Sequence, residues 1–132
     1  MEIEIFTLCD YAQEWAGKLF INGTFDMINA RSFPTSVPSC TIAGKLRFSA
    51  KESGSHFLKI KVIDAAGKDL IKPVEGEINV PAPPPVLDYS TIHFAVNLMQ
   101  LQLPAAGSYA IELFIDNEWQ SGLKLTAVQQ QQ

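Results

Sequence analysis

The sequence predicts an all-β fold, a two-sheet antiparallel β-sandwich of about eight strands, and three observations lead to it. Apolar and polar residues alternate with a period of two in separate segments along the whole chain, which is typical of half-buried strands. Glycine or proline punctuates the breaks between these segments, and no segment has a convincing helical period. Two facing sheets would bury the apolar half-faces that a single sheet leaves in water. The pattern does not distinguish an immunoglobulin-like from a jelly-roll strand order.

The chain is predicted to form one domain over residues 1–128. With 132 residues and 47% hydrophobic content, it can bury roughly two-thirds of the surface that its unfolded form exposes, without help from disulfides or a metal. Residues 129–132 are four glutamines with no apolar anchor, which predicts a disordered polar tail.

The first two strands are predicted over residues 2–9 and 18–27. Residues 10–17 break the alternation and end in a glycine, so we expect a loop there. Gly23 lies on the apolar parity of the second strand, which suggests a bulge or a close approach of another group to the backbone. Residues 32–39 contain two prolines that cannot donate ladder hydrogen bonds, and we expect them to cross between sheets or run along an edge.

The third and fourth strands are predicted at residues 40–48 and around residues 56–62. The turn that follows, residues 64–68, has the composition of a type I turn closed by a left-handed glycine, with the Asp64 carboxylate accepting from the turn backbone. That geometry places Val62 opposite Leu70, and both residues lie on the apolar parity.

The fifth strand is predicted over residues 75–80 and ends at a stiff proline-rich spacer, residues 81–85. In the long sixth strand the apolar parity switches, which predicts a β-bulge near residues 97–99 or a strand that changes sheets. The chain closes with a hairpin over residues 107–128. Its apolar residues all carry odd numbers, so Ile111 can oppose Leu123 or Leu125 only through an odd-length loop or a bulge near Gly122.

The N-terminal residues carry acids where a secretory signal would carry bases and an apolar block, and no apolar run is long enough to span a membrane. We therefore predict a cytoplasmic protein without a membrane partner. In a reducing cytoplasm Cys9 and Cys40, which share the parity of core residues, are expected to be buried, inert thiols.

The charge distribution is uneven, although the net charge of −4 is mild and argues against nucleic acid as a partner. Seven of the ten basic residues lie between residues 45 and 72, beside only three acids. If the third and fourth strands pair, Arg47 faces Lys59 and Lys45 faces Lys61, and such like-charged pairs repel unless an anion or nearby acids neutralise them. The alternative that we favour is that these lysines solvate an edge strand and prevent aggregation.

No catalytic, cofactor-binding or metal-binding residues are predicted, and we do not expect an enzyme. His56 and His93 are each expected at the surface, without a second ligand at metal spacing. Asp10, Tyr11 and Asp26 form a polar set that would need the 10–17 loop to fold back before it could converge. The preferred interpretation is that Asp10 caps a turn and Tyr11 covers the core.

The function that we predict is a non-enzymatic protein-interaction or structural module that binds another protein or a copy of itself. The segments considered for this role are residues 10–17, 31–39 and 116–119, because sandwiches concentrate binding in end loops and exposed faces. The candidate interaction residues are Phe33, Trp119, Lys59 and Lys61. The alternative is a small-ligand or carbohydrate-binding module, which would need an aromatic platform on an exposed sheet face. The outward positions identified for such a platform are Phe20, Phe57, Tyr89, Thr91, His93 and Phe114.

Several short motifs resemble those of a family of small, uncharacterised bacterial proteins, a domain of unknown function. They are Phe6-Thr7-Leu8-Cys9-Asp10-Tyr11-Ala12, Gly17-Lys18-Leu19, Gly23-Thr24-Phe25-Asp26, Phe33-Pro34, Pro38-Ser39-Cys40, the Ile63-Asp64 to Gly67-Lys68 turn and Gly107-Ser108-Tyr109. The resemblance extends over nearly the whole length. It implies a compact β-sandwich and a soluble intracellular product, and it implies no activity or binding residues.

Overall fold

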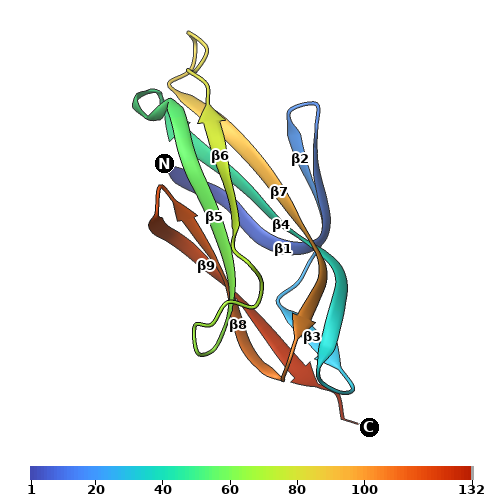
Figure 1. The fold of residues 1–132 in the computed structure, drawn as a ribbon. Helices are drawn as coiled ribbons and strands as arrows, with labels where there is room; N and C mark the ends of the chain where they lie inside the picture. The colour runs from blue at the N-terminus through green and yellow to red at the C-terminus, as the bar shows by residue number, and fades with distance from the viewer. Residues whose placement is uncertain (132) are drawn as a thin grey trace.

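The computed structural model describes residues 1–131, which form nine β-strands and one short 3₁₀ helix (Figure 1). The elements are β1 (Glu2–Trp15), β2 (Lys18–Thr24), β3 (Met27–Ala30), β4 (Thr35–Ser49), η1 (Ala50–Glu52), β5 (Gly54–Asp64), β6 (Val74–Val80), β7 (Tyr89–Leu103), β8 (Gly107–Ile115) and β9 (Glu118–Gln129). A four-stranded sheet has the order β2-β1-β4-β7, and a five-stranded sheet has the order β3-β9-β8-β5-β6. No α-helix occurs in the described part of the chain, so the all-β prediction is confirmed.

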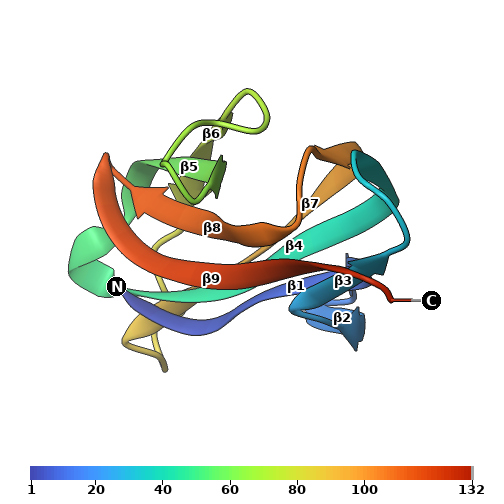
Figure 2. The same cartoon turned by 90° about the horizontal axis from the view of Figure 1, so that it is seen from below.

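Both sheets contribute to one hydrophobic core. Ile42 and Phe48 of β4, in the first sheet, are fully buried together with Ile60, Ile111 and Leu125 of the second. Figure 2 shows the β8–β9 hairpin lying across β1 and β4. The alternation of apolar and polar residues therefore has the predicted result, because alternate side chains along the strands of each sheet point into a shared interior.

The strand pairing is antiparallel except at one place. β3 pairs parallel with β9, from Met27 opposite Thr126 to Ala30 opposite Gln129, so the prediction of a wholly antiparallel arrangement is wrong there. The physical reason is that residues 18–27 are not one strand. β2 ends at Thr24 in the four-stranded sheet, and the chain then crosses to the other sheet before β3 begins.

Residues 10–15 continue β1 and do not form the predicted loop. β1 and β2 make a tight hairpin in which Trp15 opposes Lys18. Its two turn residues, Ala16 and Gly17, have φ of 52° and 77°. Positive φ at both positions is the signature of the type I′ turn, whose twist suits a hairpin.

The β1–β2 hairpin folds over the outer face of the four-stranded sheet. Ala12 and Ile21 of the hairpin pack against Cys9 and Ala43 in a second, smaller hydrophobic cluster. This curl explains why the alternation in the sequence fails near residue 10. β1 buries one face against the main core up to Leu8, and beyond that point it buries residues against its own sheet.

β7 remains in one sheet and has no bulge at the predicted position. Its ladder with β4 is in continuous register from Ser49 opposite Tyr89 to Thr35 opposite Leu103. The apolar parity switches because Gln100 has φ of 54°. A residue with left-handed backbone turns the following side chains to the other face of the strand without adding a residue. The prediction considered only a bulge or a change of sheet.

The turn predicted at residues 64–68 is confirmed, and so is the pairing that it sets. The Asp64 Oδ1 atom accepts hydrogen bonds from the backbone N–H groups of Ala66 and Lys68, both at 2.9 Å, and Gly67 has φ of 82°. The backbone N–H of Leu70 donates to the Val62 carbonyl at 2.8 Å, as the predicted pairing requires.

In the closing hairpin Ile111 opposes Leu123, and the register shifts between Leu113 and Phe114. The turn has two residues, Asp116 and Asn117, with φ of 52° and 66°. The even-length loop is therefore compensated by a bulge, one of the two predicted solutions.

The C-terminal glutamines differ from the predicted tail. Gln129 is the last residue of β9, and the Gln130 N–H donates to the Ala30 carbonyl at 2.7 Å. Gln132 lies outside the described residues.

Candidate interaction surfaces

The structure divides the predicted basic island between the two sheets. β4, which carries Lys45 and Arg47, pairs with β1 and β7, whereas β5, which carries Lys59 and Lys61, pairs with β6 and β8. The predicted opposition of Arg47 to Lys59 is therefore wrong. Pairing between distant strands cannot be read from residue parity, because both strands satisfy the same alternation in either sheet.

Each of these basic residues has a nearby partner. The Glu4 carboxylate lies 3.6 Å from Lys45 Nζ and 2.8 Å from an Arg47 guanidinium nitrogen. Lys61 Nζ lies 3.3 Å from the Asp69 carboxylate. Lys59 opposes Glu75 on β6, and its Nζ lies 4.9 Å from the centre of the Phe114 ring. The like-charged pairs that would require an anion are therefore absent, and Lys45, Arg47 and Lys61 have acidic partners within the chain. The favoured interpretation is wrong as well, because β4 and β5 are interior strands and neither is an edge.

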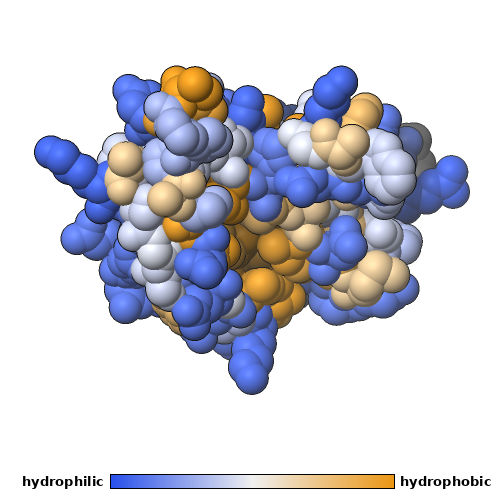
Figure 3. Space-filling model, turned by 90° about the horizontal axis from the view of Figure 1, so that it is seen from above, coloured by the Kyte–Doolittle hydropathy of each residue, from blue (hydrophilic) through white to orange (hydrophobic). Residues whose placement is uncertain are grey.

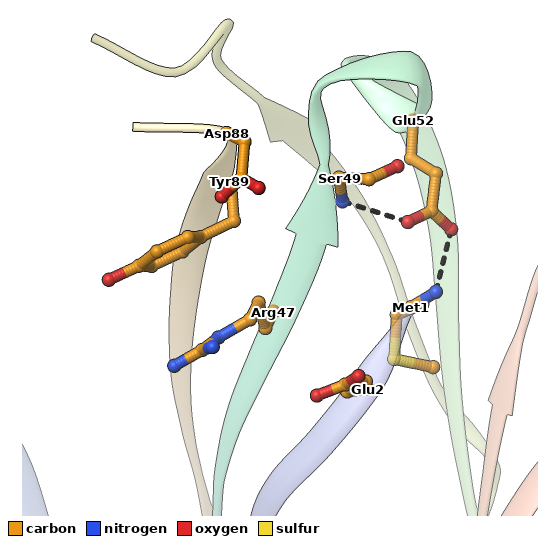
Figure 4. Close-up of a pocket in the computed structure, with 7 residues that line it drawn as sticks. All are labelled: Met1, Glu2, Arg47, Ser49, Glu52, Asp88 and Tyr89. Atoms are coloured by element: carbon orange, nitrogen blue, oxygen red, sulfur yellow. Dashed lines mark hydrogen bonds and ion pairs between the residues drawn. The ribbon is translucent and has the colours of Figure 1, made fainter. Parts of the chain in front are cut away.

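A polar pocket lies where β1, β4 and β7 reach one end of the molecule (Figure 4). The Arg47 guanidinium lies 4.2 Å from the centre of the Tyr89 ring. The Glu52 carboxylate accepts from the Met1 amine and from the Ser49 N–H, each at 2.9 Å. These two contacts lower the pKa of Glu52 to about 2, the amine contributing most. Glu52 therefore stays ionised and holds the N-terminus in place.

His56 lies beside this pocket and is less exposed than predicted. Its side chain is 16% exposed and its ring lies 5.0 Å from that of Phe48. Nδ1 is 2.6 Å from an Asp116 carboxylate oxygen, and Nε2 is 2.5 Å from the Glu52 carbonyl oxygen. The Glu52 carbonyl, and then Asp116, raise the pKa of His56.

Because both neighbours are acceptors, this geometry suits an imidazolium that donates from both ring nitrogens. Neither nitrogen then has a free lone pair for a substrate proton. Asp116 also accepts from the Phe57 N–H at 2.9 Å, a bond that is the main cause of its lowered pKa. His56 and Asp116 thus connect the β8–β9 turn to the start of β5.

His93 lies on the outer face of β7, as its parity predicts, but the β1–β2 hairpin covers it. Its side chain is 9% exposed, and Nδ1 is 2.7 Å from a Glu14 carboxylate oxygen.

The two cysteines are buried free thiols, as predicted. Burial raises the pKa of Cys40 to about 11, and it also raises that of Cys9. No group of three or more potential metal ligands was found among residues 1–131.

The polar set of Asp10, Tyr11 and Asp26 does not have the predicted roles. Asp10 is an exposed residue within β1 and caps no turn, and its carboxylate occupies the space beside Gly23, where a Cβ atom would lie 2.7 Å from Oδ2. The close approach predicted at Gly23 is therefore present. Tyr11 is exposed and does not cover the core, and Asp26 lies in the crossing between the sheets.

The two predicted aromatic anchors have different environments. Phe33 is partly buried and packs against the main core, so it is not an exposed anchor. Trp119 is 59% exposed near the tip of the β8–β9 hairpin, and its Nε1 donates to the Glu112 carboxylate at 2.5 Å. Of the two, only Trp119 has an exposed large apolar side chain.

An exposed aromatic cluster on the β1–β2 hairpin was predicted only in part: Phe20 was expected to face outward, but Tyr11 and Trp15 were assigned to a loop. Tyr11, Trp15 and Phe20 are 49%, 70% and 46% exposed. The strand register places all three on one side of the hairpin, because Gln13 opposes Phe20. We call this surface the aromatic face, and its six residues are Tyr11, Gln13, Trp15, Lys18, Phe20 and Asn22. The odd-numbered aromatics before Ala16-Gly17 were the available signal, but the segment was interpreted as a loop.

A second unpredicted surface lies between β6 and β7. Both are edge strands, and no other strand in the described residues pairs with their outer edges. Val96, Phe94 and Ile92 of β7 point toward the core and are only partly buried. Their partners on β4 include Ile42 and Leu46, which are fully buried. The core is therefore incompletely covered along residues 92–96 of β7, whereas Leu98, Leu101 and Leu103 farther along the strand are buried.

The facing edge strand has the same character. Val74 and Ile78 of β6 are partly buried residues packed against the main core. Figure 3, which views the molecule from above, shows a hollow near the centre of the surface with hydrophobic residues around it. We call the surface between β6 and β7 the open side, and define it by Ile92, Phe94, Val96, Val74 and Ile78.

The comparisons with known proteins identify a family but no activity. The profile of a family of unknown function, DUF6941, matches residues 4–128. No curated protein matches the sequence. Among solved structures, similarity was found to a Pseudomonas fluorescens alkylpurine DNA glycosylase, AlkC, bound to DNA containing an abasic site analog. That match has a TM-score of 0.48 and 8% identity, and it covers 78% of this chain and 28% of the glycosylase.

One prediction about partners is corrected by this comparison. The mild negative charge led to the exclusion of nucleic acid, but one protein of similar structure, the glycosylase named above, is bound to DNA. Net charge alone is a poor guide, since a local surface can bind a ligand that the whole chain repels. The exclusion is withdrawn, and the similarity itself assigns no ligand to this chain. No helix among residues 1–131 is long and apolar enough to cross a membrane.

Proposed function

Because this chain belongs to the DUF6941 family of unknown function, we propose its function from its geometry: a non-enzymatic module that accepts an extended polypeptide strand along its open side. The observation that supports this most is the unequal burial of two neighbouring strands. Ile42 and Leu46 of β4 are fully buried, and β7 beside them leaves Ile92, Phe94 and Val96 partly exposed.

An added strand would pair with the free backbone groups at the edge of β7 and would also cover its partly exposed apolar side chains. An edge strand presents unpaired N–H and C=O groups, which another extended backbone can pair with. Alternate side chains of that strand would point inward and cover the partly exposed residues of β7. Apolar residues at every second position are therefore the expected signature of the partner segment.

The strand order supports the same position for the partner. The series β9-β8-β5-β6 and β1-β4-β7 correspond to G-F-C-C′ and A-B-E of an immunoglobulin-like sandwich, and we favour that order over a jelly roll. In the constant-type arrangement strand D pairs beside E. The proposed partner would take the place of D, next to β7.

The non-enzymatic part of the proposal draws on the state of the reactive groups. The nitrogens of His56 are both occupied, His93 is covered, and both thiols are buried. A general base or nucleophile must reach its substrate, and none of these four groups is free to do so.

The test uses a display library of ten-residue peptides that alternate apolar and polar residues, with binding of the selected peptides measured by calorimetry. Ile92→Glu should weaken binding at least tenfold, because it puts a charge under the bound strand. Thr91→Glu is the matched control: the preceding residue is exposed and points to the outer face, so binding should persist. Equal loss in both variants, or a library without binders, would contradict the proposal. Melting curves establish that both variants are folded.

A further inference from the structure

We propose that the aromatic face of the β1–β2 hairpin binds a neutral, linear oligosaccharide. This site shares no residue with the open side, so its failure or success is independent of the strand-accepting function.

The arrangement of the rings suggests a ligand with repeated units. Phe20 opposes Gln13 and therefore lies diagonally between Tyr11 and Trp15. Diagonal neighbours across an antiparallel pair are about 7–8 Å apart. The three rings thus form a row along the hairpin and do not enclose a single pocket. A ligand that contacts all three must itself be extended.

The platform is held in place before a ligand arrives. Ala12 and Ile21 anchor the opposite side of the hairpin against Cys9 and Ala43, and Glu14 contacts His93 at 2.7 Å. A surface fixed in this way loses little conformational entropy on binding.

The polar groups among the rings are also oriented. The Tyr11 hydroxyl donates to the Gln13 carbonyl oxygen Oε1 at 2.7 Å. This bond fixes the Gln13 amide and leaves its NH₂ group as a hydrogen-bond donor. Asn22, opposite Tyr11, supplies a second amide at the same end of the row.

The charge of the surface selects the class of ligand. The chain carries a net charge of −4, yet the aromatic face contains no carboxylate and only one cation, Lys18. A neutral ligand complements such a surface, since it brings no charge that must be desolvated without a partner. The C–H groups of a sugar ring can stack on the electron-rich face of an aromatic ring, and its hydroxyls can bond to the two amides.

The experiment is calorimetric titration of the intact chain with cellohexaose, maltohexaose and chitohexaose, and with the disaccharide of each series. We expect at least one hexasaccharide to bind, and its disaccharide to bind at least tenfold more weakly because it reaches fewer rings. Trp15→Ala and Phe20→Ala should each weaken the binding tenfold or more. Trp119→Ala should leave it unchanged, because that indole, 59% exposed against 70% for Trp15, belongs to the other sheet.

Three results would overturn the proposal. The first is the absence of binding by all three hexasaccharides, and the second is binding that Trp15→Ala does not weaken. The third is a different occupant: a dimer in analytical ultracentrifugation that Trp15→Ala dissociates, or oligothymidine binding that shows the same mutational loss. Trp15→Phe, which keeps a ring, should retain most of the sugar affinity and so separates stacking from an effect on folding.

Discussion

The two long sides of the core are closed in different ways. On one side the chain itself joins the sheets: the Phe25 N–H donates to the Leu8 carbonyl of β1 at 3.1 Å, and the Asp26 carbonyl accepts from the Thr126 N–H of β9 at 2.9 Å. On the other side β6 and β7 are connected only through residues 81–88, a proline-rich segment at one end (Figure 1). We call the first the joined side.

This difference shows that coverage of a two-sheet core depends on where the chain crosses between sheets. On the joined side, two crossing residues and the short strand β3 lie beside β9, whose Leu125 and Ala127 are 1% and 3% exposed. The open side has no crossing of this kind along its length, and its apolar residues remain partly in contact with water. The comparison can be tested by measuring the free energy of unfolding of variants, because the contribution of an apolar side chain to that free energy depends on how far it is buried.

The largest expected effect is at the joined side. Leu125 of β9 is 1% exposed and lies next to the residue that bonds the crossing. Leu125→Ala should lower the free energy of unfolding by about 2–5 kcal/mol, since it leaves a cavity in a fully packed region. Chemical denaturation measures this value. A loss below about 1 kcal/mol would show that the joined side is not tightly packed.

A substitution at Gly44 should have an intermediate effect. A Cβ atom there would lie 2.2 Å from the Phe94 ring, so the ring must move. Overpacking of this kind costs about 1–3 kcal/mol, and the space beside β7 gives the ring somewhere to go. Gly44→Ala should therefore yield a folded protein with a lower melting temperature. Failure to fold would indicate that the region around Phe94 is as confined as the joined side.

The pair of His56 and Asp116 belongs to neither long side and provides a pH-dependent reference. The stability that comes from the raised pKa of His56 is fully present below the ordinary histidine pKa of 6.5, and it is lost as the pH rises through the raised pKa. The stability that comes from the lowered pKa of Asp116 is present above the ordinary aspartate pKa of 3.8, and it is lost as the pH falls through the lowered pKa.

The contribution of the pair should therefore be largest between about pH 4 and pH 6.5. Asp116→Ala should cost about 1 kcal/mol there, a modest value because the carboxylate is half-exposed. Denaturation curves from pH 3 to pH 9 measure the difference between variant and parent. A difference that does not change with pH would show that the ion pair between His56 and Asp116 does not stabilise the fold.

The smallest effect is expected on the open side. Val96→Ala should cost less than about 1 kcal/mol, because the valine side chain is already partly in water. The same denaturation assay gives the value. If it approaches that of Leu125→Ala, then β7 is covered as fully as β9 and the contrast between the sides disappears.

Local features were the predictable part of the fold. The Asp64 turn, the pairing of Ile111 with Leu123 and the proline-rich spacer depend on residues that are close in sequence, where parity and turn chemistry are sufficient. The pairing of β4 with β1 and β7, and of β5 with β6 and β8, depends on strands far apart, and the same alternation suits several partners.

The candidate surfaces were not predictable for a related reason. Trp15 was assigned to a loop because the hairpin changes the face that it buries near residue 10, which removes the simple alternation. The partial exposure of Ile92 and Phe94 follows from what is missing beside β7, and residue parity cannot show a missing neighbour.

The most direct test of the open side is amide hydrogen exchange of the chain with and without a selected ten-residue peptide. The free chain should exchange faster along the outer edge of β7 than in β8, and the peptide should slow exchange in β7 while leaving β2 and β3 unchanged. Protection that appears in β2 or β3 and not in β7 would contradict the proposal that β7 accepts a strand.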